Sequence, residues 1–393
     1  MVRTSGRDVL ATLARWTGDL ALAEDAVQDA TLTALERWPR DGVPDNPVAW
    51  LRLTARRRAV DLVRREASRR PKEEAAMDLT VTDPEEPSDS MVEDDLLRLV
   101  FTCCHPSLAP ATQVALALRT LCGLTTAEVA RAMLVSEASM AKRLTRARQK
   151  IKQARIPYRV PPDHELPDRW AAVLTTTYLL FNEGYAASGG PDLVRDELLD
   201  EAIRLARLLV RLQPDDAGAV GLLALMLLQD SRRAARVDAA GAAVLLGDQD
   251  RDLWDAAKVE EGVRLVGEGL RRSPDRPDRF VVQAAIAACH ALAPAYDETD
   301  WGAVVSWYDV LLTLDAGPVV RLNRAAAVAG RDGPAAGLAE VDAVPGLEDY
   351  PLWHATRGVL LRRLGRTAEA EAADRRAAAL PLNDAQRALL REG

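Results

Sequence analysis

The stretch GLTTAEVARAMLVSEASMAKRLTRARQKI, residues 123–151, decides the fold of the N-terminal half. Thr125 and Glu128 have the spacing of a capping box, which opens a short helix through about Met133. A turn at 134–136 follows, and Ser136 can cap a second helix. Two short helices joined by such a turn predict a helix-turn-helix.

The second of these helices has two different faces. Its apolar residues share one stripe at helical spacing: Met140, Leu144, Ala147 and Ile151. Hydrogen-bond donors occupy the opposite face: Ser139, Lys142, Arg146 and Gln149, flanked by Arg143 and Lys150. Such donors suit base edges and phosphates in a DNA groove. The alternative is a short helical hairpin whose basic face is only solvated.

Length and composition favour an all-α protein. The 393 residues suggest two or three domains at roughly 150 residues each. Aromatic residues make up only 4%, and Ala and Leu dominate, which disfavours large sheets. The longest apolar run, 220–228, is far shorter than the ~20 residues of a membrane span. No secretion signal or paired cysteine framework is evident, so we expect a cytoplasmic protein without disulfides.

The net charge of −8 is unevenly distributed. Residues 1–157 hold 24 basic and 22 acidic residues, whereas residues 158–393 hold 27 basic and 37 acidic residues. A basic block at 50–72 is followed by ten acidic residues without any Lys or Arg at 73–95. The acidic segment predicts a flexible linker, because its composition cannot bury enough apolar surface. A second basic block follows Glu137, and a proline-rich segment near 157–167 marks a boundary.

Two helices are predicted before the acidic segment. In the first, over 23–38, an apolar stripe lies opposite an acidic face: Asp25, Gln28, Asp29, Leu32 and Glu36. A solvated helix face is the simpler interpretation of that pattern. A loop from Pro39 to Pro47 precedes the second helix, which starts near Val48. Arginines surround its narrow apolar stripe, which favours contact with phosphates.

The sequence predicts no catalytic residue, metal ligand or cofactor. Cys103, Cys104 and His105 are adjacent, but zinc needs about four ligands and no second pair lies nearby. We therefore expect these cysteines, like Cys122 and Cys289, in the core. No phosphate-binding loop, nucleophile elbow or His-Glu-x-x-His motif is present.

The region from Leu166 onward is predicted to be an acidic helical array. A weak repeat approximates the small-residue spacing of a tetratricopeptide hairpin: Gly358, Leu361, Gly365, Ala370 and Ala377. A generic helical array explains the pattern equally well. Polar and aromatic clusters at 178–185, 248–254 and 300–301 could line a pocket, but helix caps and core positions are the favoured interpretation.

Several motifs together resemble an extracytoplasmic-function (ECF) RNA polymerase sigma factor of the sigma-70 family. They are AEDAVQDA at 23–30, PVAWL at 47–51, RAVDLVRR at 58–65 and the helix-turn-helix. The stretches LVFTCCHP at 99–106, YLLFNEGY at 178–185, DQDRDLW at 248–254 and TDW at 299–301 resemble the subgroup with a long C-terminal helical extension. The resemblance implies a region 2 domain at 1–68, an acidic linker at 69–95, a region 4 domain at 96–157 and a tetratricopeptide-like extension at 158–393.

The resemblance also implies the roles of individual residues. Asp25, Gln28, Asp29 and Leu32 would dock on the clamp helices of the largest polymerase subunit. The loop at 39–47 would hold an unstacked base of the −10 element, with nearby cations on the DNA: Arg52, Arg56, Arg57, Arg58, Arg64 and Arg65. Family members commonly have Asn where this chain has Arg57, which cannot accept a hydrogen bond. The −35 element would be read by Ser139, Lys142, Arg143 and Arg146, while the polymerase flap binds the same domain.

We therefore expect a promoter-specificity subunit that is no enzyme, is monomeric when free and binds core RNA polymerase and promoter DNA. Its extension is expected to be regulatory. One alternative is a one-component helix-turn-helix regulator whose helical array senses a ligand. Another is an enzyme with its active site in the array, for which only Asn182, Glu183 and the Asp-rich clusters offer support.

Overall fold

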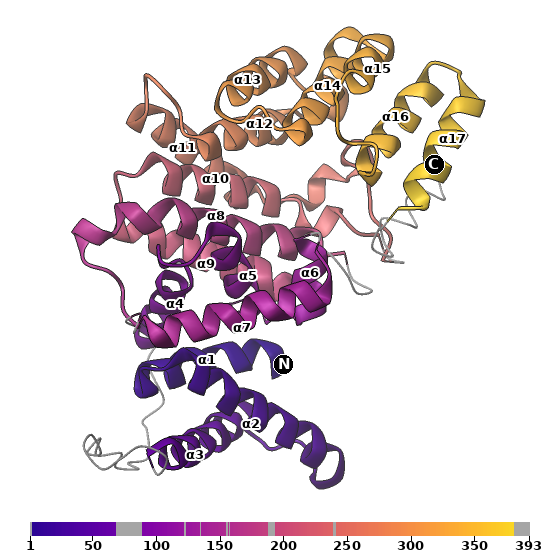
Figure 1. Ribbon diagram of the computed structural model, residues 1–393. Coiled ribbons are helices and arrows are strands. Elements are labelled where there is room, and N and C mark those ends of the chain that lie inside the picture. Colours follow the sequence, from indigo (N-terminus) through magenta and orange to yellow (C-terminus); the bar gives the residue numbers. More distant parts are fainter. Residues whose placement is uncertain are drawn as a thin grey trace. The chain divides into compact units, whose positions relative to one another are not determined.

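A computed structural model describes residues 2–67, 89–121, 123–133, 135–154, 156, 158–187, 193–238 and 241–380 (Figure 1). Over these residues the structure consists of seventeen α-helices, five short 3-10 helices and one isolated bridge between Val237 and Ala243. The predicted all-α fold is confirmed. The chain forms two compact units, Met1–Leu180 and Phe181–Gly393.

Three helices begin unit 1: α1 (Val2–Thr17), α2 (Leu20–Asp41) and α3 (Pro47–Ala67). Asp19 caps α2, because its Oδ1 accepts hydrogen bonds from the Ala21 and Leu22 amides at 2.9 and 3.2 Å. The buried stripe of α2 consists of alanines and one leucine: Leu20, Ala23, Ala26, Ala30 and Ala34. Small side chains let α1 and α3 approach α2 closely, while the other face of α2 stays exposed.

The predicted loop from Pro39 begins later than expected. Helix α2 continues through Pro39 to Asp41, because a proline in the last turn removes only one hydrogen bond. Gly42, at a φ of 83°, ends the helix, and its amide donates to the Trp38 carbonyl at 3.1 Å. The rings of Trp38 and Trp50 meet edge to face at 5.6 Å and join α2 to α3.

Four more helices of unit 1 are α4 (Asp89–Cys103), α5 (Pro110–Thr120), α6 (Thr126–Ala132) and α7 (Glu137–Gln153). The predicted capping box is confirmed. The Glu128 amide donates to Thr125 Oγ1 at 3.2 Å, and the Thr125 amide donates to Glu128 Oε2 at 2.7 Å. Ser136 caps α7 by accepting a hydrogen bond from the Ser139 amide at 3.3 Å. The predicted helix-turn-helix is therefore α6 and α7.

Helix α4 begins inside the segment that composition predicts to be a flexible linker. Residues 89–95 are helical, whereas the earlier part of that segment, 69–88, lies outside the described residues. Asp95 is only 1% exposed and pairs with Arg98 at 3.0 Å and Arg15 at 3.3 Å. Its carbonyl accepts a hydrogen bond at 2.7 Å from the Tyr158 hydroxyl, which also lies 3.0 Å from the Ala11 carbonyl. These tertiary contacts order the end of an otherwise acidic segment.

The last helix of unit 1 is α8 (Pro167–Tyr185), which follows the 3-10 helix η1 (Asp163–Glu165) and runs into unit 2. Unit 2 continues with α9 (Asp196–Leu212), α10 (Ala217–Asp230), α11 (Ala256–Arg272) and α12 (Arg279–Leu292). The predicted apolar run forms α10, which is buried on all sides between its neighbours. Gly221 of α10 and Gly269 of α11 both contact Val281 of α12, where a larger side chain would clash.

Each of the remaining helices packs against the next one along the chain. They are α13 (Trp301–Leu314), α14 (Pro318–Asp332), α15 (Pro334–Asp342), α16 (Pro351–Arg363) and α17 (Thr367–Ala378). Short 3-10 helices lie between α10 and α13: η2 (Arg233–Ala235), η3 (Leu246–Asp248), η4 (Arg251–Leu253) and η5 (Tyr296–Glu298). The predicted small-residue spacing places Gly358 of α16 against α17, and Gly365 adopts a positive φ of 72° in the turn between them. A helical C-terminal region is thereby confirmed.

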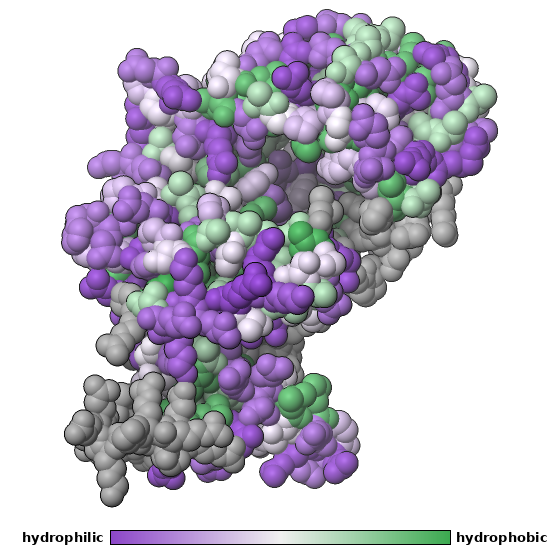
Figure 2. All heavy atoms as spheres, in the orientation of Figure 1, coloured by the Kyte–Doolittle hydropathy of each residue, from purple (hydrophilic) through white to green (hydrophobic). Residues whose placement is uncertain are grey.

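None of the described helices combines the length and the apolar composition that crossing a membrane requires. Hydrophilic residues cover much of the face shown in Figure 2, with smaller hydrophobic areas between them.

Candidate functional site

The acidic face of α2 is largely open in the structure. Asp25, Gln28 and Leu32 are exposed, and Leu32 retains 51% of its accessible surface. Asp29 is half-buried and accepts a hydrogen bond from Arg58 Nε at 2.6 Å. The bond raises the pKa of Arg58. One predicted polymerase contact and one predicted DNA contact are therefore paired with each other.

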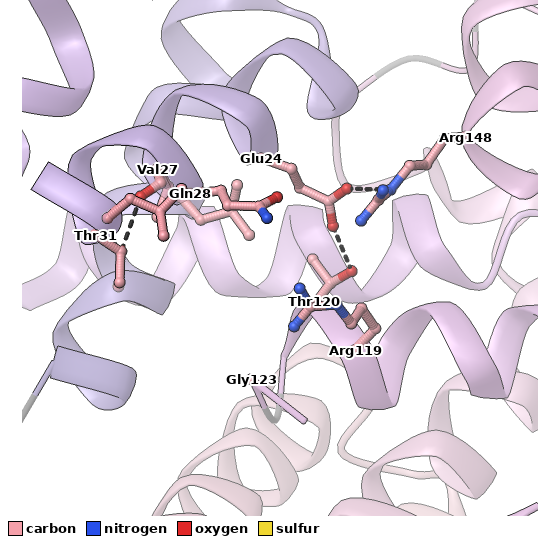
Figure 3. A pocket seen from close by; sticks show the side chains of 11 residues that line it. Glu24, Val27, Gln28, Thr31, Arg119, Thr120, Gly123 and Arg148 are labelled. Atoms are coloured by element: carbon pink, nitrogen blue, oxygen red, sulfur yellow. Dashed lines mark hydrogen bonds and ion pairs between the residues drawn. The ribbon is translucent and has the colours of Figure 1, made fainter. Parts of the chain in front are cut away.

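A buried carboxylate on the same helix was missed by sequence reasoning. Glu24 Oε2 lies 2.5 Å from Arg148 Nε of α7, and Glu24 Oε1 accepts a hydrogen bond from the Thr120 hydroxyl of α5 at 3.2 Å (Figure 3). Burial raises the pKa of Glu24, although Arg148 and Thr120 act in the opposite direction. The only signal in the sequence is an acidic residue next to a buried alanine, which is too common to identify such a contact.

Glu24 and Arg148 border a pocket of about 230 Å³. Helices α1 and α2 form one side and α5 and α7 the other, and two of the predicted polymerase contacts, Gln28 and Leu32, line it. Figure 3 shows Gln28, Arg119 and Thr120 around the opening. Part of the acidic face of α2 therefore lies opposite α5 and α7, the second helix of the helix-turn-helix.

Helix α3 carries the first group of cations. Arg52, Arg57 and Arg64 have no ion-pair partner among the residues that the structure describes. Arg56 lies over the Trp16 ring, with its Cζ 5.3 Å from the ring centroid. The side chain of Arg65 lies outside the described residues. All six predicted −10 contacts thus lie on α3, the structure describes five of their side chains, and Arg58 is bound to the carboxylate of Asp29.

Helix α7 carries the second group. Its buried stripe is the predicted one: Met140, Leu144, Ala147 and Ile151. Ser139, Lys142 and Arg146 are exposed, and Arg143 is half-buried. Within the described part of the chain, none of these three cations forms an ion pair. The Ser139 hydroxyl accepts a hydrogen bond from Ser136 Oγ at 2.9 Å or donates to it, so it is partly occupied.

The structure also places the residues that offered alternative interpretations. Cys103 and Cys104 are buried, as predicted, and burial raises the pKa of Cys104 to about 12. Cys122 lies outside the described residues. Glu183 is buried beside Arg195 at 3.6 Å, which is a structural ion pair. In the clusters at 248–254 and 300–301, Asp250 and Asp300 cap helices, as the favoured interpretation predicts.

Comparisons with known proteins agree with this arrangement. Residues 1–69 match the family model of sigma-70 region 2, and residues 98–151 match that of sigma-70 region 4. Residues 169–270 match a family of unknown function, DUF6596. The first two matches cover α1–α3 and the helix-turn-helix.

Full-length relatives extend the comparison. An uncharacterized protein of Rhizobium meliloti is 45% identical over 388 residues, which cover 97% of this chain and 91% of the relative. A probable ECF RNA polymerase sigma factor, SigI of Mycobacterium tuberculosis, is 34% identical over 154 residues. That alignment covers 38% of this chain and about half, 52%, of SigI. With matches to regions 2 and 4 in the right order and a distinct helical region after them, the chain belongs to the ECF group of the sigma-70 family and carries a C-terminal extension.

Proposed function

We propose that this protein is an alternative sigma factor that binds core RNA polymerase, recognises the −35 and −10 promoter elements and promotes DNA opening. Asp25, Gln28, Asp29 and Leu32 contact the clamp helices of the largest subunit, and the helix-turn-helix domain contacts the flap. The observation that carries the proposal is that α3 and α7, in the two sigma-70 regions, expose Arg57, Arg64, Lys142 and Arg146, which form no ion pair among the residues that the structure describes.

The two cation-rich helices suit different parts of a promoter. Helix α7 presents Lys142 and Arg146 next to Ser139, a combination of donors that fits a major groove. Helix α3 follows the loop that starts at Gly42, whose Val43 side chain is 61% exposed. An unstacked base of the −10 element enters near this loop, and Arg52, Arg57 and Arg64 bind the phosphates around it.

Polymerase binding also separates α2 from α7 in this proposal. The pocket between them is lined by Gln28 and Leu32 of α2. A polymerase helix that covers this face of α2 must therefore displace α7, which carries Arg148. The Glu24–Arg148 pair then opens and both groups are hydrated again. Because a buried ion pair gains little over its hydrated partners, this separation has a small free-energy cost.

Footprinting with and without core polymerase tests the function. We expect protection of both promoter elements when polymerase and the protein are combined, and none with the protein alone, because the net charge of residues 1–157 is near zero. A symmetric footprint without polymerase would instead identify a one-component regulator.

Charge reversal on α2 tests the docking face. Asp25→Lys is expected to weaken binding to core polymerase by about ten-fold or more. The reason is that the new lysine would face the polymerase surface that, in this proposal, complements the acidic face of α2. Asp215→Lys in unit 2, at another exposed aspartate, is the matched control and should leave that affinity unchanged. Equal affinities for both variants in a pull-down titration would contradict the proposed face.

A further inference from the structure

Three arginines of unit 2 lie near one another and have no carboxylate partner among the described residues. Arg236 is buried, its guanidinium Cζ lies 3.3 Å from the centroid of the Tyr185 ring, and it donates to the Tyr185 carbonyl. Arg232 Cζ lies 5.6 Å from the same ring. Arg251 donates to the carbonyls of His290 and Ala293 at 2.9 and 2.7 Å. We call Arg232, Arg236 and Arg251 the arginine cluster.

The neighbouring carboxylate is already occupied. Asp230 is fully buried and pairs with Arg233 at 2.7 Å and Lys258 at 2.8 Å. Among the described residues, no carboxylate oxygen lies within ion-pair distance of the arginine cluster. Burial lowers the pKa values of Arg236 and Arg251, and the positive charge of Arg232 lowers them further. Arg236 alone is enough to hold the Tyr185 ring in place. This contact therefore does not explain why Arg232 and Arg251 lie nearby.

Unpartnered polar atoms surround the cluster. Arg251 Nη2, Trp254 Nε1 and His290 Nδ1 are buried and have no hydrogen-bond partner in the described part of the chain. Burial and the charges of Arg232 and Arg251 lower the pKa of His290 to about 4, so its ring is neutral at pH 7. Buried polar atoms in proteins are nearly always satisfied, and most of these can donate. The missing partner is therefore a group that accepts hydrogen bonds.

The loops that carry these atoms also hold two buried acceptors. Gln249 and Thr299 are 9% and 5% exposed, and no described residue forms a hydrogen bond with Gln249 Oε1 or Thr299 Oγ1. Aromatic rings connect the loops: Trp301 meets His290 and Tyr296 edge to face, each at 5.4 Å. Arg251 lies over the Trp254 ring, with Cζ 4.6 Å from its centroid. Flat apolar surface thus lies beside the cations.

We propose that the arginine cluster, with Trp254 and His290, binds a small anion in which a phosphate or carboxylate group is attached to a flat ring. The oxyanion accepts from Arg232 and Arg251, and the ring packs against the aromatic side chains. Two or three guanidinium groups around one oxyanion form strong, charge-assisted hydrogen bonds. The site would make the extension a sensor for such a metabolite.

Calorimetric titration of the full chain with phenyl phosphate and with benzoate tests the site, and benzyl alcohol is the neutral probe. We expect at least one anion to bind and benzyl alcohol not to bind. The tighter of the two anions identifies the phosphate or the carboxylate as the natural group. Binding of neither anion, or equal binding of the neutral probe, would overturn the proposal.

Arg232→Gln is the informative variant, because few contacts hold Arg232 in the described structure: a hydrogen bond to the Gln229 side chain near the end of α10 and the Tyr185 ring. It should weaken anion binding by about ten-fold or more. Arg264→Gln removes an exposed arginine of the same unit and should have no effect. An unchanged affinity in Arg232→Gln would overturn the proposal.

His290→Phe gives a second test that keeps the ring contact with Trp301 but removes Nδ1, and should weaken binding about three-fold. Circular dichroism of each variant without ligand reports folding. The bound anion should also raise the pKa of His290 in a nuclear magnetic resonance titration of the native chain, and an unchanged pKa would count against the site. Neither polymerase nor DNA is present, so failure here is distinct from failure of the sigma-factor proposal.

Discussion

The two units use arginine in opposite ways. In unit 1, α3 and α7 expose cations that have no ion-pair partner among the described residues. In unit 2, several arginines join neighbouring helices through carboxylates, as Arg207 does with Glu261 and Arg324 with Glu340. In our proposal the exposed arginines of unit 1 recognise DNA, whereas these arginines of unit 2 hold helices together. The arginine cluster of unit 2 departs from the pattern of its own unit, which is why it points to a ligand.

The largest effect is expected from removing the cations of α7. Lys142→Ala with Arg146→Ala should weaken promoter binding by the polymerase complex by about 2–6 kcal/mol, since each base or phosphate contact contributes about 1–3 kcal/mol. Filter binding at fixed salt measures the loss. Thermal unfolding should not change, because both side chains are exposed and unpaired. Wild-type affinity in the double variant would remove α7 from the interface.

In unit 2, a buried pair should matter for stability instead. Asp230→Ala leaves Lys258 without its buried partner and removes one of three acids around Arg233, so we expect a loss of about 2–4 kcal/mol in the free energy of unfolding. Urea denaturation measures it. Asp230→Asn keeps the side-chain volume and some of the hydrogen bonds, so it should lower the free energy of unfolding by less than Asp230→Ala does. If Asp230→Ala lowered the free energy of unfolding by only about 0.5 kcal/mol, as expected for an exposed ion pair, the structural role of Asp230 would be contradicted.

The Glu24–Arg148 pair lies between these two cases. Arg148→Ala should destabilise unit 1 by about 1–2 kcal/mol at neutral pH, because it leaves a buried carboxylate unpaired. The raised pKa of Glu24 means that its protonated form is favoured in the folded chain. Without Arg148 this pKa rises further, so the loss should be full above the pKa of Glu24 in the variant and should shrink as pH falls toward the pKa of Glu24 in the native chain.

Denaturation at two pH values measures this effect, with Arg146→Ala as the control from the exposed face of the same helix. Glu24→Gln should cost less than Arg148→Ala at neutral pH, since the amide leaves no buried charge. A pH-independent loss for Arg148→Ala would show that packing, rather than the ion pair, holds α7 to α2.

The smallest effect is expected at an exposed pair of the last helix. Arg375 and Glu371 lie 3.6 Å apart and are 70% and 64% exposed. Arg375→Ala should change the free energy of unfolding by no more than about 0.5 kcal/mol. Thermal denaturation in low and high salt measures it. A loss of several kcal/mol would show that the exposed pairs of unit 2 act as a network.

Local sequence patterns correctly predicted the ends of α6 and α7 and the buried stripe of α7. The capping box at Thr125 and Glu128, the cap at Ser136 and the apolar stripe of α7 depend on residues a few positions apart, and the structure confirms them. Composition was less reliable, because residues 89–95 are helical despite their acidity. The reason is Asp95, whose partners Arg15 and Tyr158 are distant in the sequence.

By itself, the sequence determined the all-α fold, the helix-turn-helix and the two cation-rich helices, since backbone hydrogen bonding and helical periodicity act within a few residues. Only the tertiary structure decided which side chains meet: Glu24 with Arg148, Asp29 with Arg58, and the two arginines Arg232 and Arg236 with the Tyr185 ring. Such pairs depend on how helices pack, and packing brings together side chains whose separation in the sequence carries no signal.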